Sequence, residues 1–245
     1  MKVVVIIPAA GLGTRMAPAA SRAKTPSKQF TELDGTPILV HTLRKFAASP
    51  LVSEIFVALR KDEIAGFRER LEAADADQKT PLRKKVELVE GGEHRQHSVA
   101  NALAVVSAAP DDVVLVHDAV RPLVTPEIIA EVIRGAEKFG AAIAGMPAVD
   151  TVKKVERTAD GALVTATIPR EHVVMAQTPQ GFRYHVLKKA FDEAAADGFV
   201  GTDEASLVER SGKEVAVVMG SARNLKITTP ADMLLAEFYL SHQGN

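Results

Sequence analysis

Short apolar segments alternate along this chain with longer segments in which apolar and polar residues mix. The apolar segments are residues 3–7, 54–59, 86–89, 113–116, 141–146 and 214–218. Their near-continuous hydrophobicity is typical of strands that are buried on both faces of a sheet. The intervening segments predict helices at residues 37–48, 63–74, 96–107, 126–139, 183–197 and 203–209. This alternation predicts a single α/β domain over residues 1–245, with a mostly parallel, twisted sheet flanked by helices.

One segment interrupts the alternation of strands and helices. Residues 151–156 and 162–168 are extended stretches rich in β-branched side chains, and the turn at residues 157–161 between them ends in Asp-Gly. This pattern predicts a β-hairpin. An isolated two-stranded hairpin is only marginally stable in water. We therefore expect residues 148–172 to form an arm that packs either on its own sheet or on a second subunit.

The composition is that of a soluble globular protein, since 47% of the 245 residues are hydrophobic and 25% are charged. The 30 Lys and Arg residues balance the 31 Asp and Glu residues, so we expect no general binding to nucleic acid. The absence of cysteine excludes disulfides and thiolate metal sites and favours a cytoplasmic location. The apolar residues 3–10 lack the flanks of a signal peptide or membrane anchor, so we expect no membrane association.

A turn of small residues follows the first predicted strand. Ala9, Ala10, Gly11 and Gly13 leave the backbone N–H groups open to phosphates and to a base edge. The carboxyl end of a strand is where open parallel sheets bind ligands. Met16 stands where a dinucleotide fingerprint needs a small residue, and the turn lacks the Gly-Lys pair of a Walker A loop. The alternative interpretation is a plain tight connection between a strand and a helix.

The first 31 residues carry positive charge without any Asp or Glu. Arg15 and Lys28 bracket the segment that follows the turn. A nucleoside triphosphate that is cleaved between its α and β phosphates needs cations there, because charge grows on the α-phosphoryl oxygens and on the departing pyrophosphate. Arg15 and Lys28 are therefore the candidate catalytic residues, whereas Arg22 and Lys24 are interpreted as solvated loop charges.

Eight sequence blocks resemble, in order, those of the bacterial 2-C-methyl-D-erythritol 4-phosphate cytidylyltransferase family. The blocks are Pro8-Ala9-Ala10-Gly11-x-Gly13-x-Arg15-Met16, Lys28-Gln29-Phe30, Gly91-Gly92-Glu93-x-Arg95-x-x-Ser98-Val99, Val116-His117-Asp118-Ala119-x-Arg121-Pro122, Asp150-Thr151, Gln177-Thr178-Pro179-Gln180, Thr202-Asp203-Glu204-Ala205-Ser206 and Asn224-Leu225-Lys226-Ile227-Thr228. Any single block is weak evidence, but eight in order over residues 3–240 are specific. The resemblance implies a Rossmann-like domain with a protruding β-hairpin arm.

The resemblance also implies a reaction. Members of that family join CTP to 2-C-methyl-D-erythritol 4-phosphate and release pyrophosphate. The product, 4-diphosphocytidyl-2-C-methyl-D-erythritol, belongs to non-mevalonate isoprenoid biosynthesis. The family uses Mg²⁺ or another divalent cation as cofactor and forms homodimers, so CTP, a polyol phosphate and a second copy of the chain are the implied partners.

The same resemblance assigns roles to individual residues. Arg15 and Lys28 match the cations that stabilise the transition state. Arg170, Lys226 and Thr151 match residues that position the polyol phosphate, with Thr151 and Arg170 reaching the substrate bound to the partner subunit. The nucleotide-binding positions implied by the match are Ala9, Ala10, Gly11, Gly13, Gly92, Glu93, Ser98, Asp118, Ala119 and Arg121.

Some of these roles have support from chemistry. Backbone groups near Gly92 and the Ser98 hydroxyl offer donors and acceptors for the edge of cytosine. Asp118 follows the strand predicted at residues 113–116, where a carboxylate can hold Mg²⁺ together with phosphate oxygens and water. His94 and His97 lie three residues apart without a third ligand pattern, so we interpret them as surface histidines.

Two departures from the family pattern leave alternatives open. Ser27 stands where proline or glycine often precedes the lysine, and the segment before it is long, so Lys24 competes with Lys28 for the catalytic position. Glu93 stands where aspartate is common, which moves the carboxylate by one methylene. A cytidylyltransferase for another polyol phosphate, such as ribitol 5-phosphate, and a non-catalytic nucleotide-binding module are the competing functions.

Overall fold

A seven-stranded sheet forms the centre of the protein in the computed structural model, which describes residues 1–11, 27–76, 82 and 84–242. Its strand order is β11-β7-β10-β6-β1-β4-β5. The strands are β1 (Val3–Pro8), β4 (Glu54–Leu59), β5 (Val86–Glu90), β6 (Val113–Val116), β7 (Ala141–Pro147), β10 (Val174–Arg183) and β11 (Ala216–Met219). Strand β10 runs antiparallel to β6 and β7, and the other neighbouring pairs are parallel. The predicted α/β fold with a mostly parallel sheet is confirmed.

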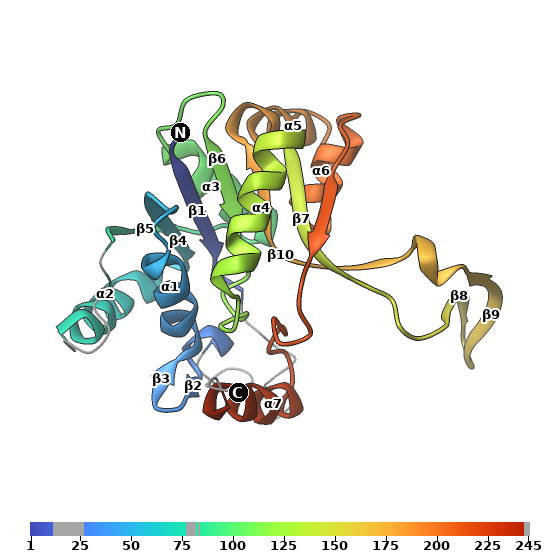
Figure 1. The fold of residues 1–245 in the computed structure, drawn as a ribbon, viewed down its shortest axis with the longest axis horizontal. Helices are drawn as coiled ribbons and strands as arrows, with labels where there is room; N and C mark the ends of the chain where they lie inside the picture. Colours follow the sequence, from blue (N-terminus) through green and yellow to red (C-terminus); the bar gives the residue numbers. More distant parts are fainter. Residues whose placement is uncertain (12–26, 77–81, 83, 243–245) are drawn as a thin grey trace.

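Helices cover both faces of this sheet (Figure 1). One face packs against α1 (Ile38–Ala48), α2 (Lys61–Ala76) and α4 (Pro126–Phe139), and the other against α3 (Arg95–Val105), α5 (Tyr184–Ala196) and α6 (Glu204–Arg210). Successive side chains of a strand point to opposite faces, so Val3, Val5 and Ile7 enter the first core and Val4 and Ile6 enter the second. Burial on both faces explains the uninterrupted apolar runs of the sequence.

Two of the longer elements were not predicted from the sequence. Strand β10 contains Gln177, Thr178, Pro179 and Gln180, whose polar side chains and proline interrupt the apolar pattern. Its pairing with β7 shifts register over this segment, and the Thr178–Pro179 peptide bond is cis. Helix α7 (Pro230–Ser241) was also missed, although its start carries a capping box and a proline in the first turn.

The edge of the sheet at which β1 and β6 end is closed by further elements. The short strands β2 (Glu32–Leu33) and β3 (Thr36–Pro37) pair there, after the short 3₁₀ helix η1 (Lys28–Phe30). Helix α7 lies next to them (Figure 1). A third apolar cluster joins these parts, and it consists of Leu33, Ile38, Val120, Leu123, Ile227 and Ala236. Within the described ranges, no helix is long and apolar enough to span a membrane.

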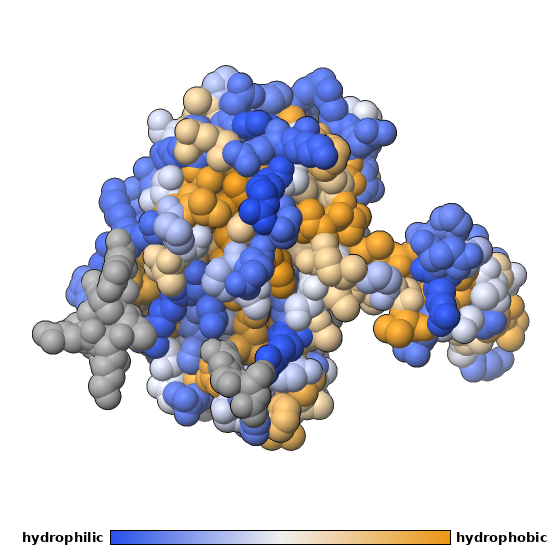
Figure 2. All heavy atoms as spheres, in the orientation of Figure 1, coloured by the Kyte–Doolittle hydropathy of each residue, from blue (hydrophilic) through white to orange (hydrophobic). Residues whose placement is uncertain are grey.

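The predicted hairpin forms a separate two-stranded sheet from β8 (Val152–Thr158) and β9 (Gly161–Ile168). It projects from the body of the molecule on two extended segments (Figure 1). Its apolar side chains are exposed, with Leu163 and Val164 retaining 65% and 61% of their accessible surface. Hydrophobic residues appear on the arm and along the segments that carry it (Figure 2). The arm does not pack on its own sheet.

Candidate active site

A pocket of about 210 Å³ opens at the edge of the sheet where β1 and β6 end. The residues that line it come from five separate segments of the chain, one of which is η1. They are Pro8, Ala9, Ala10, Gly11, Lys28, Gln29, Gly92, Glu93, His94, Arg95, Ser98, Asp118, Ala119, Val120 and Lys226. The small-residue turn, the loop before α3, the segment after β6 and the segment before α7 therefore meet at one place, as the carboxyl ends of parallel strands must.

The turn after β1 is held by backbone hydrogen bonds and by one buried side chain. Ala9 N–H donates to the carbonyl of Ala58 at 2.7 Å, which extends the pairing of β1 with β4 by one residue. The Gln29 amide donates to the carbonyl of Ala9 at 2.6 Å and is buried. The turn and η1 are thus tied together, and Lys28 and Gly11 both line the pocket.

The contacts of Ser27 explain why a serine stands directly before Lys28. Its hydroxyl donates to a carboxylate oxygen of Glu63 at 2.5 Å, and the Arg60 guanidinium donates to the same oxygen at 2.9 Å. Both acceptor and donor lie on or beside the first turn of α2. A proline or glycine at position 27 has no side chain that can make this bond. The serine therefore anchors the backbone directly before Lys28.

The loop from Gly91 to Glu93 packs closely against the small-residue turn. A Cβ atom on Gly91 would lie 2.5 Å from the Cβ atom of Ala10, so the approach needs glycine. The Ser98 hydroxyl accepts from Gly92 N–H at 3.1 Å and lies 3.1 Å from the carbonyl of His94. Ser98 thus shapes the loop from the first turn of α3, while Glu93 is exposed at the pocket.

The Asp118 carboxylate lies at the centre of a cluster of cations. One of its oxygens accepts from Lys226 Nζ at 2.8 Å and from Arg121 Nε at 3.4 Å, and the other accepts from Arg95 Nε at 3.3 Å. Burial by itself raises the pKa of Asp118, but the charges of Arg95 and Lys226 outweigh it and hold that pKa well below its usual range. The carboxylate is therefore ionised at any physiological pH.

Arg121 braces Asp118 from the side away from the pocket. Its Nη1 donates to the carbonyl of Asn224 at 2.7 Å, and its side chain is almost fully buried. Burial lowers the pKa of Arg121, although Asp118 acts in the opposite direction. Arg121 does not line the pocket, so a direct contact with the nucleotide, as implied by the family match, stays a prediction.

Sequence reasoning did not single out the ion pair between Arg95 and Glu204. Arg95 Nη1 donates to both carboxylate oxygens of Glu204, at 2.7 and 2.8 Å. Glu204 is the first residue of α6 and retains 1% of its accessible surface. Both residues belong to quoted sequence blocks, but nothing in the local sequence indicates that two positions 109 residues apart form a pair.

A protein-held magnesium ion does not fit the described side chains. Both oxygens of Asp118 already accept hydrogen bonds from cationic groups, so a metal ion bound there would displace Lys226 or Arg95. Within the part of the chain that the structure describes, no group of three His, Cys, Asp or Glu side chains could hold a metal ion. His94 and His97 are exposed, with ring centroids 5.2 Å apart, in line with their interpretation as surface histidines.

The remaining predicted site residues lie elsewhere. Thr151 and Arg170 belong to the arm, and neither lines the pocket of its own chain. The Arg170 guanidinium donates to the carbonyl of Val149 at 2.7 Å, which closes the base of the arm. Gly13, Arg15 and the alternative Lys24 fall outside the described residues. Lys28 does line the pocket, and its assignment as the catalytic lysine in place of Lys24 stays a prediction.

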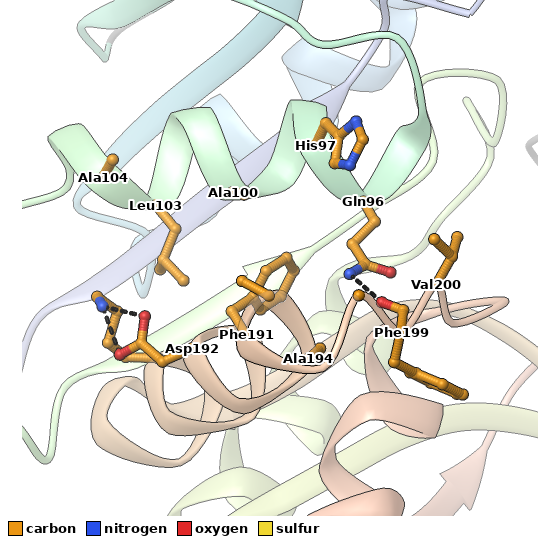
Figure 3. Close-up of a pocket in the computed structure, with 13 residues that line it drawn as sticks. Gln96, His97, Ala100, Leu103, Ala104, Phe191, Asp192, Ala194, Phe199 and Val200 are labelled. Atoms are coloured by element: carbon orange, nitrogen blue, oxygen red, sulfur yellow. Dashed lines mark hydrogen bonds and ion pairs between the residues drawn. The ribbon is translucent and has the colours of Figure 1, made fainter.

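A second cavity, of about 380 Å³, lies between α3, α5 and the loop at residues 198–200 (Figure 3). Its walls are mostly apolar, with Leu103 and Phe191 facing each other across it (Figure 3). At one end the Gln96 amide donates to the carbonyl of Phe199 at 3.0 Å and accepts from Gly201 N–H at 2.8 Å. Gln96 therefore joins the start of α3 to the loop that leads into α6.

His117 lies buried directly before Asp118. Its Nε2 is 3.1 Å from the carbonyl of Arg121, which can only accept, so Nε2 carries the proton. Nδ1 then accepts from the Thr178 hydroxyl at 3.2 Å, and that hydroxyl accepts in turn from Asp118 N–H at 3.0 Å. Burial lowers the pKa of His117 to about 4, so the neutral ring orients the backbone of the site.

The fold and the pocket define an α/β protein that binds a phosphorylated ligand between a small-residue turn and a cluster of cations, at the carboxyl edge of its sheet. Comparison with known proteins identifies it further. The model of the 2-C-methyl-D-erythritol 4-phosphate cytidylyltransferase family matches residues 3–242, so the chain belongs to that family. It is therefore a nucleotidyltransferase.

Relatives and solved structures agree with this membership. The chain is 58% identical to the 2-C-methyl-D-erythritol 4-phosphate cytidylyltransferase of Acidobacterium capsulatum, over 100% of both chains. It is 53% identical to that of Solibacter usitatus, over 100% of this chain and 98% of the relative. The crystal structure of the Francisella tularensis enzyme has a TM-score of 0.78 and 35% identity, covering 97% of this chain and 99% of that one.

The buried neutral His117 predicts a pH dependence of folding. Its pKa is about 4 in the folded chain against 6.5 for an unperturbed histidine, so the unfolded state binds the extra proton. The contribution of the neutral His117 to the free energy of unfolding is fully present above pH 6.5 and is lost as the pH falls towards 4. Lowering the pH from 7 to 5 should reduce the free energy of unfolding by about 2 kcal/mol through His117.

Denaturant unfolding at the two pH values tests this, with His117→Gln as the comparison. The glutamine amide still donates to the carbonyl of Arg121 but does not titrate. Between pH 7 and pH 5, the free energy of unfolding should therefore fall by about 2 kcal/mol less in the variant than in the wild type. Equal losses in both proteins would show that His117 is not the group responsible.

Proposed function

We propose that this chain transfers the cytidylyl group of CTP to 2-C-methyl-D-erythritol 4-phosphate, with release of pyrophosphate. The observation that carries the proposal is the convergence of the small-residue turn, the loop at Gly92 and the cations around Asp118 in one pocket, in a chain that the family model matches over residues 3–242. The pocket has a wall of backbone groups for the base and phosphates and a wall of cations for a second anion.

The nucleotide lies between the two loops in this proposal. Backbone groups of Gly92 and the adjoining Glu93 read the edge of cytosine, supported from behind by Ser98. The turn at Ala9, Ala10 and Gly11 receives the phosphates, because it presents backbone without bulky side chains at the end of a buried strand. Asp118 and Ala119 lie on the sugar side, with Gly13 following the described part of the turn.

Two anions must meet for the reaction to occur. A phosphate oxygen of the polyol phosphate attacks the α-phosphorus of CTP, and the bond from that phosphorus to the oxygen bridging to the β-phosphate breaks. A phosphate monoester has its second pKa near 6, so the attacking oxygen is already unprotonated at neutral pH. The reaction therefore needs positive charge more than it needs a general base. Lys28 and Arg15 are proposed to stabilise the charge on the α-phosphoryl oxygens and the leaving pyrophosphate.

Lys226 is proposed to bind the phosphate of the polyol substrate. In the structure Lys226 Nζ bonds to Asp118 at 2.8 Å, so the carboxylate holds the ammonium group at the pocket. Asp118 thus acts by positioning cations, an assignment that matches its three contacts better than metal ligation does. We further propose that Mg²⁺ enters with the triphosphate of CTP and that the enzyme works in the cytoplasm.

The arm is proposed to complete the active site of a second copy of the chain. Its apolar side chains at Val155, Leu163 and Val164 are exposed, and a hairpin of this size gains stability only by packing on something. Thr151 and Arg170 lie on the arm and not at the pocket of their own chain. A homodimer in which each arm reaches the other subunit accounts for both observations.

A pyrophosphate-release assay tests the reaction. We expect release from CTP only when 2-C-methyl-D-erythritol 4-phosphate and Mg²⁺ are both present, and loss of activity on chelation of the metal. Ribitol 5-phosphate serves as the matched alternative substrate. Faster turnover with ribitol 5-phosphate would favour the other polyol, and no release with either substrate, despite CTP binding, would favour a non-catalytic nucleotide-binding module.

The catalytic lysine is tested by two matched substitutions. Lys28→Ala should lower kcat by roughly 10²- to 10³-fold with a modest change in KM for CTP, because the lost charge acts mainly in the transition state. Lys24→Ala should change either constant little. The reverse result in steady-state kinetics would assign the catalytic role to Lys24.

The shared active site is tested by mixing two defective variants. Arg170→Ala should raise KM for the polyol phosphate more than KM for CTP, since guanidinium and phosphate form an oriented pair. Lys226→Ala should weaken binding of the same substrate from within its own subunit. In a mixed dimer both lesions fall on one site and the other site is intact, so activity should return to about a quarter of the wild-type value.

Subunit exchange must be shown directly for this experiment, for example with two distinguishable tags. Each variant incubated with itself provides the control for recovery. Exchange without recovered activity would mean that the arm serves its own subunit and that the cross-subunit assignment of Arg170 is wrong.

A further inference from the structure

Arg95 connects two carboxylates that lie on different elements of the fold. Its Nη1 is bound by both oxygens of Glu204, and its Nε donates to Asp118 at 3.3 Å. The side chain is 30% exposed and lines the nucleotide pocket, whereas the Glu204 side chain behind it is 1% exposed. One guanidinium thus spans from a wholly buried carboxylate to the carboxylate at the centre of the site.

Glu204 is itself fixed in place by its surroundings. The Gln180 side chain donates to Asp203 at 2.7 Å and accepts from Ala205 N–H at 3.1 Å, so it binds the residues on either side of Glu204. Asp203 and Ser206 form the capping box of α6. The carboxylate is therefore attached to strand β10 through a rigid helix start.

Burial of the ion pair between Arg95 and Glu204 has a free-energy cost, so its presence needs a reason. Burying a carboxylate and a guanidinium together seldom makes a protein more stable than apolar residues of similar size would, because desolvation offsets the attraction. Glu204 also binds Arg95, which lines the pocket proposed to receive a triphosphate, and a nearby negative charge opposes the binding of a polyanion. Neither a gain in stability nor a favourable charge for nucleotide binding accounts for a buried glutamate here. A role in orienting Arg95 does account for it.

We propose that Glu204 is a positioning residue for nucleotide binding, which holds Arg95 so that the base-reading loop at Gly92 and the Asp118 carboxylate keep a fixed separation. Arg95 directly follows that loop at the first position of α3. Its guanidinium links this position to Asp118 on one side and to α6 on the other. The inference rests on the proposed function, because it takes CTP as the nucleotide.

The test is the affinity for CTP with Mg²⁺ and without any polyol phosphate, measured by isothermal titration calorimetry. Glu204→Gln keeps the shape of the side chain but loses its charge and one acceptor. If the carboxylate acts by holding Arg95, Kd for CTP should rise by roughly ten- to a hundredfold, the range typical of residues that orient a binding group from behind. If only charge matters, removal of a negative group should leave Kd unchanged or lower it, and that result would overturn the proposal.

A control in the same helix separates positioning from loss of stability. Val208 is fully buried in α6 one turn after Glu204, and it touches the core instead of the pocket. Val208→Ala should lower Tm while leaving Kd for CTP within about twofold of the wild-type value. Equal weakening of CTP binding in both variants at similar Tm would overturn the proposal in favour of a purely structural role.

Two further variants keep the test decisive if Glu204→Gln folds poorly. Arg95→Met should weaken CTP binding, and adding Glu204→Gln to it should weaken binding no further, because the glutamate acts only through the arginine. A further loss in the double variant would contradict the proposal. Failure of the wild-type protein to bind CTP would refute the proposed function as well, whereas CTP binding that Glu204→Gln leaves unchanged refutes the positioning role alone.

Discussion

The carboxylate of Asp118 is the group that holds together the cations Lys226, Arg121 and Arg95 at the pocket. It fixes Lys226 from the segment before α7, Arg121 from its own turn and Arg95 from the start of α3. Three cations cannot be held this close to one another without a negative charge between them. The same contacts keep the carboxylate ionised despite its burial. The site is therefore a cation cluster assembled on one anion, and the fold brings its members together from three distant segments.

The sheet brings these segments together, and the polar residues of β10 secure them. Thr178 receives the N–H of Asp118 and binds His117, while its carbonyl accepts from the Asn224 amide at 2.9 Å. Gln180 binds both sides of Glu204 at the start of α6. The polar segment of β10, which does not have the apolar pattern of a strand, thus provides hydrogen bonds that hold the residues around Asp118 and Glu204. β10 lies between β6 and β7, from where Thr178 reaches the segment after β6 and Gln180 reaches the start of α6.

Local sequence was enough to predict most of the fold and to place the small-residue turn and Asp118 at strand ends that line the pocket. Apolar runs such as residues 3–7 revealed the buried strands, and the strand ends located the small-residue turn and Asp118. Strand β10 was missed because the polar side chains at its centre, which make hydrogen bonds, interrupt the apolar pattern. The pair of Arg95 and Glu204 was missed because it forms between residues 109 positions apart, and contacts of that kind depend on tertiary packing. The sequence pattern predicted the hairpin, but the roles of Lys226 and of Thr151 and Arg170 on the arm came from the resemblance to a family.

Charge balance supports the proposal that a second copy of the chain completes the pocket. The described residues that line or brace it carry four cations, Lys28, Arg95, Arg121 and Lys226, against the carboxylates of Glu93, Asp118 and Glu204. A surplus of one positive charge is small for a site proposed to receive a triphosphate and a phosphate monoester together. In the proposed function, Arg15, a divalent cation carried by the nucleotide and Arg170 of a second copy supply additional positive charge. The arm projects from the body of the molecule and carries the Arg170 guanidinium at its base, an arrangement that suits this proposed contribution.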